Sequence, residues 1–597
     1  MSIEESLKQT VINAVSTLYS KEAADSQIQI QKTKKEFEGD LTIVVFPLLK
    51  LSGKKPEDTA NEIGNYITAN WNNAKGFNVV KGFLNISLKH TVITDILLGI
   101  NANPDFGTVP VTEKSKKVVI EFSSPNTNKP LHLGHLRNNF LGDSISKILK
   151  AGGNNVIKVN LVNDRGIHIC KSMLAWQKWG HGETPETSGI KGDHLIGNYY
   201  VEFDKHYKQE IKDLMAQGMT EDEAKQKAPS IVEAHEMLKK WENGDKEVVE
   251  LWKTMNSWVY AGFDVTYKLM GIEFDKIYHE SETYLEGKQY VLDALEKGIC
   301  HKDETGATFI DLTADGLDKK ILLRGDGTTV YMTQDLGTAA MRQREFNFDE
   351  HIYVVGNEQD YHFKALKLVL KKMGFDWADA IKHFSYGMVE LPNGKMKSRE
   401  GTVVDADDLI AEMTETARQT SEELGKLHEM SKEQQDETVS TIAMAALKYF
   451  ILKVDPKKTI LFNPAESIDF NGNTGPFVLY TYARICSIFR KLEEKSISRE
   501  TLSADFDTIS ETESNLIQFI ATFPNVLQDA CKMCSPAQIA NFVYEVCKQF
   551  NQFYHDYKIL GEENSQIREF RLTLAENAGR VIKKCLNMLG INVLEKM

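Results

Sequence analysis

The sequence predicts a multidomain α/β protein built on a doubly wound parallel sheet, flanked by an N-terminal α+β domain and a C-terminal all-α domain. Three observations support this. The chain has 597 residues, several times the size of an ordinary domain. From Lys117 onward, short β-branched segments alternate with helical segments, the pattern of a parallel sheet. Beyond Val404, almost every segment has the periodicity of an amphipathic helix.

The N-terminal segment mixes both kinds of element. Helical periodicity covers 6–19 and 58–71, and the runs LTIVVF and GFLNISL have the residue types of strands. The polar stretch 101–110 contains both Pro and Gly, which is typical of a linker. We therefore expect a small α+β domain over 1–110.

The central domain is expected over 111–404. Its strand candidates are VVIEFSS, NNVIKVNLV, TTVYM, HIYVVG and HFSYGMVEL, separated by helical segments. A charged helical region at about 180–265 is interpreted as an insertion between the two halves of the sheet. The helical remainder divides into a connector over 405–465 and an all-α domain over 466–597.

Composition narrows the possible classes of protein. A formal net charge of -14 argues against a protein that coats nucleic acid through a global positive field, so any RNA contact must use a local patch. The seven cysteines form no regular framework, and the Cys531/Cys534 pair has no second pair nearby, so we expect no metal site. The N-terminus lacks the bases of a signal peptide, and no apolar run approaches the roughly 18 residues of a membrane span. We expect a cytoplasmic protein that does not enter a membrane.

The first signature, VVIEFSSPNTNKPLHLGHLRNNFLGD, places His132 and His135 where a strand and a loop lead into a helix. A helix N-terminus offers free N–H groups and a partial positive charge, which suit phosphates. Gly134 has no side chain, so a nucleotide base can lie against the backbone. The two histidines share a face of the first turn and can donate to phosphate oxygens. Taken alone, capping or surface histidines would be the simpler interpretation.

The second signature, GMVELPNGKMKSREGTVV, places a cluster of basic and hydroxyl side chains in a loop that follows a strand. Such a loop can close over a triphosphate, and its cations would meet the charge that develops on the phosphates. A basic loop is ordinarily only a solvated loop. Paired with HLGH in one α/β domain, it indicates ATP chemistry.

The two signatures together resemble class I aminoacyl-tRNA synthetases, whose HIGH and KMSKS elements bracket ATP at the carboxyl edge of a Rossmann-like sheet. SSPN, KPLHLGHLR, DGTTVYMTQD, GNEQDYHF, MKSREGTVV and NGNTGPFVLYTYARI resemble the arginyl-tRNA synthetases in particular, and the likeness covers the whole chain. It implies a ligase that activates L-arginine with ATP, transfers it from arginyl-adenylate to the 3′ end of tRNA-Arg, and releases AMP and pyrophosphate. It also implies ATP bound with Mg²⁺ as a substrate complex, and a monomer.

The resemblance also implies which residues form the site. The catalytic residues would be Lys129, His132, His135, Lys397 and Arg399. ATP would contact Pro125, His132, Gly134, His135, Met388, Lys395, Lys397 and Ser398. Arginine would contact Glu121, Ser124, Asn126, Tyr331, Asp335 and Gln359. Among these, Asp335 would neutralise the guanidinium, because a carboxylate matches its planar fork. Considered alone, Asp335 would more simply be a surface acid.

The C-terminal helices resemble the anticodon-binding domain of the family. Unstacked bases need aromatic platforms and polar groups at their edges. The matching positions are Phe477, Tyr480, Arg484, Tyr554 and Met597. Core packing explains each aromatic residue equally well on its own. The N-terminal domain resembles the family's extra domain that touches the outer corner of tRNA.

Two segments depart from the family pattern. KMKSR is one residue shorter than expected; we take Lys397 as the catalytic lysine, and Lys129 could compensate for the change. NDRGIHIC, over 163–170, stands where we expect a sequence closer to GDWGxQFG, which affects the geometry of the substrate-side loop.

Two rival interpretations remain open. One is another class I synthetase or a nucleotidyltransferase that shares HxGH; the segment from NTGP to Arg484 and the helical C-terminal region disfavour a nucleotidyltransferase. The other is a non-catalytic tRNA-binding paralogue. The intact HLGH, Asp335 and Lys397 disfavour such decay.

Overall fold

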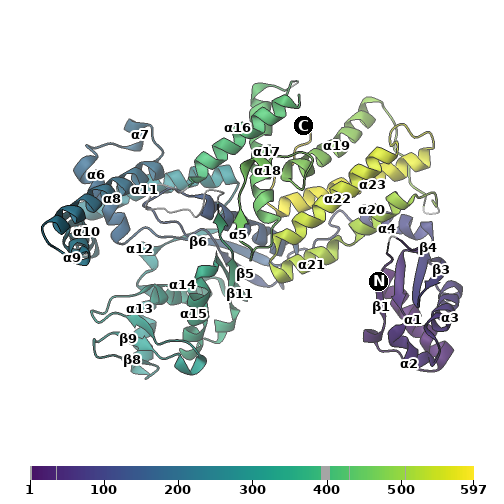
Figure 1. Cartoon of the computed structure of the whole chain (residues 1–597), viewed down its shortest axis with the longest axis horizontal. Coiled ribbons are helices and arrows are strands. Elements are labelled where there is room, and N and C mark those ends of the chain that lie inside the picture. Colours follow the sequence, from purple (N-terminus) through teal and green to yellow (C-terminus); the bar gives the residue numbers. More distant parts are fainter. Residues whose placement is uncertain (1–2, 35, 391–403, 426, 429, 504–505) are drawn as a thin grey trace. The chain divides into compact units, whose positions relative to one another are not determined.

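A five-stranded parallel sheet positions the site (Figure 1). The structure is a computed structural model that describes residues 3–34, 36–390, 404–425, 427–428, 430–503 and 506–597. The sheet has the order β12–β11–β5–β6–β7, and all four pairings are parallel. Its strands are β5 (Lys117–Glu121), β6 (Asn155–Val162), β7 (Lys276–His279), β11 (Glu350–Gly356) and β12 (Ile381–Tyr386). The predicted parallel sheet is confirmed.

The strand order reverses between β5 and β11. From β5 the chain adds β6 and β7 on one side, and β11 and β12 follow on the other. In open α/β sheets, ligands bind outside the carboxyl ends of the strands at such a reversal. The carboxyl ends of β5 and β11 therefore mark the expected site.

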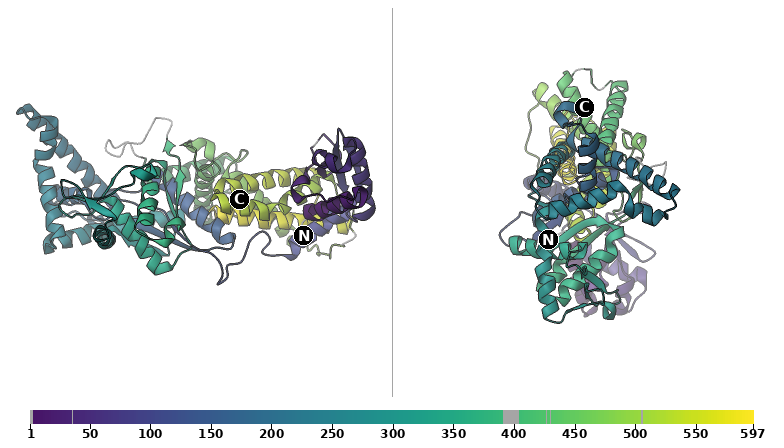
Figure 2. Two further views of the ribbon diagram at one scale, coloured as in Figure 1. Left: turned by 90° about the horizontal axis from the view of Figure 1, so that it is seen from below. Right: turned by 90° about the vertical axis from the view of Figure 1, so that its left-hand side faces the viewer.

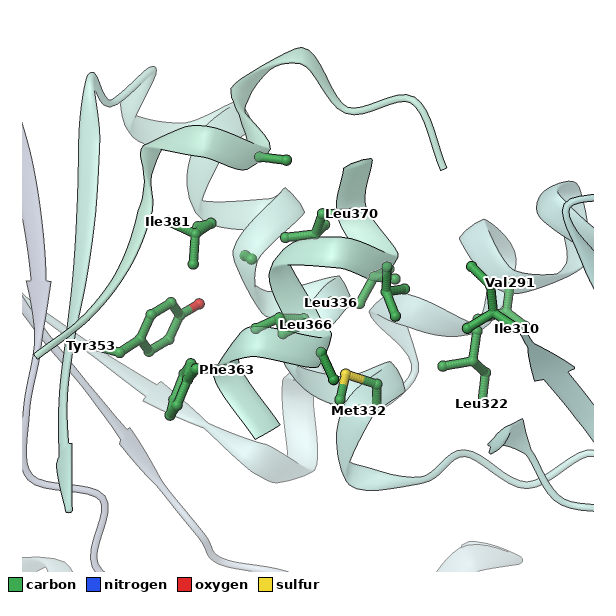
Figure 3. Close-up of a cluster of buried hydrophobic side chains, with 14 of the residues drawn as sticks. Val291, Ile310, Leu322, Met332, Leu336, Tyr353, Phe363, Leu366, Leu370 and Ile381 are labelled. Carbon is green, nitrogen blue, oxygen red and sulfur yellow. The ribbon is translucent and has the colours of Figure 1, made fainter. Parts of the chain in front are cut away.

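Helices cover this sheet and supply its hydrophobic core. The covering helices include α5 (Leu133–Ala151), α6 (Ile167–Trp179), α14 (Tyr331–Phe346) and α15 (Asp360–Lys372). Figure 3 shows side chains of α14 and α15, such as Leu336 and Leu366, in one cluster with Tyr353 and Ile381 of the sheet. Close packing also fixes α5, because a Cβ on Gly142 would come within 2.1 Å of the Phe122 ring.

A helical region separates β6 from β7 (Figure 2). It contains α7 (Pro185–Ser188), α8 (Gly192–Ala216), α9 (Glu221–Lys227), α10 (Pro229–Glu242) and α11 (Lys246–Met270). Local chemistry sets the limits of α11: the Asp245 carboxylate accepts from two N–H groups of the first turn, and Gly271 ends the helix at φ +65°.

Between β7 and β11 lies a small antiparallel sheet of order β10–β9–β8. The elements of this region are α12 (Glu280–Thr283), α13 (Glu286–Glu296), β8 (Cys300–Lys302), β9 (Thr308–Ile310) and β10 (Lys320–Leu323). The predicted strand TTVYM is wrong, because α14 begins at Tyr331. Its threonines serve local turns instead: Asp326 Oδ1 accepts from the backbone N–H and the hydroxyl of Thr328 at 2.9 and 2.7 Å.

The chain folds as two compact units. The first comprises 1–106, 488–522 and 548–579, and the second comprises 107–487, 523–547 and 580–597. The N-terminal part of the first unit is an antiparallel sheet of order β1–β2–β4–β3 with helices, which confirms the predicted α+β fold. Its elements are α1 (Ile3–Tyr19), β1 (Gln29–Lys32), β2 (Leu41–Val44), α2 (Leu49–Ser52), α3 (Pro56–Asn70), β3 (Ala74–Val80), β4 (Phe83–Leu88) and α4 (His90–Ala102).

The C-terminal third is helical, as predicted, apart from a short pairing of β13 (Val389–Glu390) with β14 (Ile460–Leu461). Its helices are α16 (Ala406–Glu423), α17 (Lys432–Leu452), α18 (Pro464–Ser467), α19 (Gly475–Glu494), α20 (Glu511–Ala521), α21 (Phe523–Met533), α22 (Pro536–Asp556) and α23 (Ser565–Met588). In the part of the chain that the structure describes, no helix is both long and apolar enough to span a bilayer.

Candidate active site

One side chain of α5, Asn138, ties together the carboxyl ends of three strands. Its Oδ1 accepts from the Ser123 backbone N–H at 2.6 Å, just beyond β5. Its Nδ2 donates to the Val354 carbonyl in β11 at 2.7 Å and to the Tyr386 hydroxyl in β12 at 3.0 Å. Ser123 has a φ of +63°, so the chain turns sharply there. Sequence reasoning missed Asn138, although it lies one turn after HLGH.

The HLGH histidines lie together at the N-terminus of α5. His132 is the N-cap residue, and its backbone N–H donates to His135 Nδ1 at 3.1 Å. In the neutral His135 ring the proton is therefore on Nε2, which can donate elsewhere. Burial lowers the pKa of His132 to about 4, helped by the Lys129 ammonium, and it lowers that of His135 well below its usual value. Both imidazoles are neutral at neutral pH.

Gly134 and Lys129 complete this end of the helix. A Cβ on Gly134 would lie 3.0 Å from the His132 ring, so glycine lets the imidazole rest against the backbone. The Lys129 side chain is partly buried, and desolvation lowers the pKa of its ammonium. Among the described residues, Lys129 has no hydrogen-bonded or ion-paired partner. An anion placed beside it would relieve the cost of a desolvated, unpaired charge.

Arg137, also in α5, holds the segment that carries Met388. Its guanidinium donates to the carbonyls of Met388, Pro456 and Lys458 at 2.6, 3.0 and 2.7 Å. The Met388 side chain is 39 % exposed beside the site, while its carbonyl is fixed. Sequence reasoning did not single out Arg137, because only the fold brings three distant carbonyls to one side chain.

A cavity of about 510 Å³ opens at the end of β6 and the start of α14; we call it the acidic cavity after Glu242, Glu280 and Asp326 in its lining. Asn126, Glu280 and Tyr331 line it, and Asp335 lies one turn after Tyr331 in α14. Asp335 Oδ2 lies 2.5 Å from His362 Nε2. Burial, reinforced by the carboxylates of Asp164 and Asp335, raises the pKa of Glu280 to about 7. Arg165, Lys288 and Arg324 also line the cavity, so the carboxylates that suit a cation are those at Glu280 and its neighbour Asp335.

Glu280 is an acid of this cavity that sequence reasoning missed. It stands in a charged stretch, HESET, where nothing in the sequence separates it from its acidic neighbours. Only the position of β7 beside β6 brings it to the cavity.

Glu121, predicted to contact arginine, has a partner within the protein. Its carboxylate is paired with the fully buried guanidinium of Arg342, from α14. That guanidinium also lies 4.7 Å from the centre of the Tyr278 ring. The Glu121 side chain therefore anchors Arg342. Glu280 lines the cavity, and the Asp335 carboxylate is close enough to Glu280 to raise its pKa.

The loop after β5 is fixed through its backbone and leaves polar side chains exposed. Asn163 donates through its backbone N–H to the Pro125 carbonyl at 2.9 Å and through Nδ2 to the Ser124 carbonyl at 3.2 Å. The side chains of Ser124 and Asn126 are exposed, as is Gln359 at the end of a 3-10 turn after β11. These groups can therefore reach a ligand.

The divergent NDRG segment forms one wall of the acidic cavity. Asp164 is buried and accepts from the Tyr260 hydroxyl and from the N–H and hydroxyl of Ser281, each at 2.8 Å. The Arg165 guanidinium stacks over Tyr284, 3.9 Å from its ring centre, and lines the cavity. The departure from the family pattern thus forms an ordered structure at the site.

The predicted tRNA contacts belong to both units. In the second unit, the Arg484 guanidinium lies 4.9 Å from the centre of the Tyr480 ring, and the Phe477 ring lies 5.4 Å from that of Tyr544. In the first unit, Tyr554 is 39 % exposed. Met597 is partly buried at the C-terminus.

Four residues predicted to contact ATP lie outside the described residues: Lys395, Lys397, Ser398 and Arg399.

Comparison with known families places this geometry in a class. Residues 102–463 match the catalytic domain of class I tRNA synthetases for arginine. Residues 478–597 match the DALR anticodon-binding domain, and residues 2–88 match the arginyl-tRNA synthetase N-terminal domain. With HLGH at the carboxyl edge of a parallel sheet, these matches define a class I aminoacyl-tRNA synthetase.

Individual relatives agree over their whole length. The chain is 57 % identical to an arginine–tRNA ligase of Parabacteroides distasonis and 53 % identical to one of Flavobacterium psychrophilum, in each case over 100 % of both chains. The solved structure of Thermus thermophilus arginyl-tRNA synthetase shares the fold, with a TM-score of 0.77, 23 % identity and 100 % coverage of both chains.

The chain belongs to the arginyl-tRNA synthetase family. It is an enzyme that activates arginine with ATP and joins it to the 3′ end of tRNA-Arg, releasing AMP and pyrophosphate. The predicted family, fold class and activity are confirmed.

Proposed function

We propose that activation occurs between two sites of opposite charge: the ATP phosphates bind at the N-terminus of α5, and the arginine guanidinium binds in the acidic cavity. The observation that carries this proposal is the concentration of carboxylates at Glu280 and Asp335, on the same sheet edge as the desolvated Lys129 ammonium. Lys129 has no charged partner among the described residues, and a guanidinium beside Glu280 and Asp335 would relieve the repulsion between their carboxylates.

On the ATP side, we assign Lys129, His132 and His135 to the phosphates. The neutral His135 ring can donate from Nε2, and Lys129 supplies the charge. Adenine would lie against Gly134 and the backbone at Met388, with Pro125 beside it. Lys395, Lys397, Ser398 and Arg399 keep the phosphate roles inferred from the family pattern. Mg²⁺ would arrive with ATP and neutralise its phosphate oxygens.

On the arginine side, we assign the guanidinium to Asp335, Glu280 and Tyr331. Asp335 is held by His362, and the Tyr331 side chain is 76 % exposed at the cavity. Ser124, Asn126 and Gln359 would bind the amino and carboxylate groups, as their exposed side chains allow. We assign Glu121 a positioning role through Arg342, because the two side chains are paired.

The protein's task in this chemistry is positioning and charge stabilisation. The arginine carboxylate attacks the α-phosphorus of ATP, and pyrophosphate leaves. A hydroxyl of the terminal ribose of tRNA then attacks the carbonyl of the adenylate, and AMP leaves. The donors at α5 would stabilise the charge on the phosphate oxygens in both steps.

We further propose that Phe477, Tyr480, Arg484, Tyr554 and Met597 read the anticodon region, that 1–110 touches tRNA, and that the enzyme acts as a cytoplasmic monomer. The match to the anticodon-binding family supports the first assignment. All seven cysteines are free, as expected in a reducing compartment. Light scattering at working concentration measures the oligomeric state directly.

The specificity assignment is tested by Asp335→Ala. Removing this carboxylate should abolish arginine-dependent pyrophosphate exchange, measured with tRNA present, and leave ATP affinity within about twofold, because ATP contacts a different group of residues. Asp264→Ala is the matched control, since Asp264 is exposed on α11. Equal loss of ATP binding and arginine activation would contradict the assignment. Running the exchange with each of the twenty amino acids tests whether any other amino acid is activated.

A further inference from the structure

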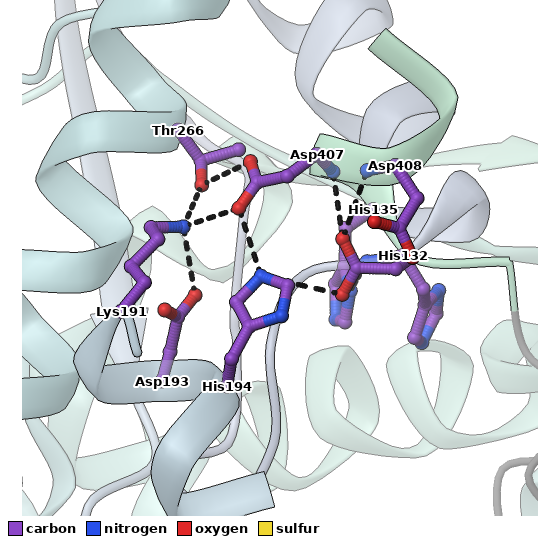
Figure 4. A network of polar contacts seen from close by, with 9 residues as sticks. His132, His135, Lys191, Asp193, His194, Thr266, Asp407 and Asp408 are labelled. Atoms are coloured by element: carbon purple, nitrogen blue, oxygen red, sulfur yellow. Dashed lines mark hydrogen bonds and ion pairs between the residues drawn. The ribbon is translucent and has the colours of Figure 1, made fainter. Parts of the chain in front are cut away.

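A charged network connects the first turns of α8 and α16 beside the HLGH motif (Figure 4). Its centre is the Asp407 carboxylate. Oδ2 accepts from Lys191 Nζ at 2.5 Å and from His194 Nε2 at 2.9 Å, and Oδ1 accepts from the Thr266 hydroxyl at 2.8 Å. Lys191 Nζ also lies 2.6 Å from the Thr266 hydroxyl and 3.1 Å from Asp193. Two helices of the insertion therefore hold one residue of α16.

The start of α16 is also paired with the HLGH segment. Asp405 forms an isolated antiparallel bridge with His132. The Leu133 N–H donates to the Val404 carbonyl at 3.1 Å, and the Ala406 N–H donates to the Leu131 carbonyl at 3.0 Å. Asp407, which the network holds, is therefore only two residues along the chain from Asp405, whose backbone is paired with His132.

A cavity of about 210 Å³ lies between the network and the residues assigned to the phosphates. It is lined by Lys129 and His132 on one side and by His194, Tyr200 and Asp405 on the other. His194 therefore belongs to the network and also faces two groups assigned to the phosphates.

A metal ion does not explain this cluster. Ligand atoms of Asp193, His194 and Asp407 lie within 4.8 Å of one another, which is compatible with a divalent cation. The Lys191 ammonium, however, contacts both Asp193 and Asp407 and already supplies positive charge between them. The arrangement is an internal ion-pair network.

We propose that His194 and Asp407, with Lys191, are positioning residues for the activation reaction: they hold the start of α16 against the HLGH segment and so set the position of His132. This inference rests on the proposed role of His132 at the phosphates. Displacement of a reacting group by about 1 Å can cost about 100-fold in rate, so such support has kinetic consequences.

The protonation of His194 matters to this support. The hydrogen bond with Asp407 raises the pKa of His194. When His194 loses its proton, Lys191 alone must balance three carboxylates. The titratable groups that face His194 are Lys191 and Asp193 beside it, Asp405 at the N-cap of α16, Asp407 in its first turn, and Lys129, His132 and Tyr200 around the cavity.

The test compares Asp407→Asn and His194→Gln with Asp408→Asn, a matched control that removes a charge from the exposed neighbouring residue. We expect Asp407→Asn to lower kcat for aminoacylation by about tenfold to 100-fold, with KM for arginine within about twofold, because the acidic cavity is untouched. Asp408→Asn should equal the wild type. His194→Gln keeps a neutral donor without the charge, so its kcat should stay at the lower level at every pH and lose the decline that we expect of the wild type as pH rises through the raised pKa of His194.

His132→Ala, measured in parallel, separates this inference from the function on which it rests. Unchanged kcat in His132→Ala would refute the phosphate role itself. A large loss in His132→Ala together with wild-type kcat in Asp407→Asn and His194→Gln would overturn the positioning role alone. If Asp407→Asn does not fold, His194→Gln decides: an unchanged pH profile, or a loss of melting temperature with no loss of kcat, overturns the proposal.

Discussion

Glu280 combines burial with a ligand-facing position. It lines the acidic cavity, and burial, reinforced by the carboxylates of Asp164 and Asp335, raises its pKa to about 7. A guanidinium binds an ionised carboxylate better than a protonated one. Arginine should therefore bind more tightly as pH rises through this pKa.

We expect KM for arginine to fall by several-fold from about pH 6 to about pH 8, measured by aminoacylation at saturating ATP and tRNA. Glu280→Gln should raise KM by about tenfold at pH 8 and remove this dependence. Glu282→Gln, at an exposed neighbour, should behave as the wild type. An unaltered pH profile in Glu280→Gln would assign the titration to another group, of which His279 is the nearest alternative, because its pKa is raised by Asp164.

The same residue gives a stability expectation with a definite sign. A carboxyl group with a raised folded-state pKa binds more protons in the folded chain between about pH 4.5 and pH 7. Its contribution to the free energy of unfolding therefore falls as pH rises through that window. Glu280→Gln should lessen this decline.

For single residues, the sequence predicts a chemical role more readily than it predicts the neighbours that each side chain has in the fold. His132 and His135 stand in a motif whose spacing indicates a function, and the family resemblance points to Asp335, so the sequence could propose all three. Glu280 and Arg137 could not be found this way, because their importance comes from contacts with residues far along the chain. Pairing also changed the interpretation of Glu121, since no local pattern reveals Arg342 as its partner.

At the scale of elements, Arg137 joins α5 to the chain around β13 and β14. It is only 1 % exposed, and its guanidinium donates to three backbone carbonyls. Losing these bonds leaves the Lys458 carbonyl without a donor among the described residues, at a cost of about 1–3 kcal/mol. The Met388 and Pro456 carbonyls still accept from the N–H groups of Ile460 and Gly387. The position of Met388, assigned to adenine, depends on the same bonds.

Arg137→Met should therefore lower the free energy of unfolding by about 1–3 kcal/mol and raise KM for ATP more than KM for arginine. Urea unfolding measures the first effect, and steady-state kinetics measures the second. Arg137→Lys keeps a charge but not the fork, so it should recover only part of the loss. If Arg137→Met is as stable as the wild type, the Lys458 carbonyl must have found another donor.

A comparison of the predicted and observed strands shows where sequence patterns are enough to predict secondary structure. Alternation of β-branched segments with helical periodicity predicted the parallel strands, because buried parallel strands are continuously apolar. TTVYM misled, because a short β-branched run fits a strand and also a turn that leads into a helix. Asp326 decides the outcome by accepting from Thr328 and turning the chain just before α14.

At the scale of the whole molecule, net charge constrains how tRNA is held. With a formal charge of -14, the protein repels RNA on average, so affinity must come from local contacts. Stacking on aromatic side chains supplies such contacts with little dependence on charge.

The order of the domains along the chain could be predicted from the sequence, because each domain contains its own motifs. The division into two compact units could not, because it depends on packing between segments far apart in the sequence, which no motif encodes.

Tyr480 provides the test at this scale. Its ring already carries the Arg484 guanidinium at 4.9 Å, an arrangement that can extend to a stacked base. Tyr480→Ala should raise KM for tRNA by about tenfold, because stacking on an aromatic side chain is worth about 1–3 kcal/mol per base, and kcat should stay within about twofold. Tyr480→Phe keeps the aromatic face and should retain wild-type KM.

Filter binding measured over a range of salt concentrations should give Tyr480→Ala the same dependence of tRNA affinity on salt as the wild type, since no charge is lost. Wild-type KM in Tyr480→Ala would instead make Tyr480 a packing residue of α19.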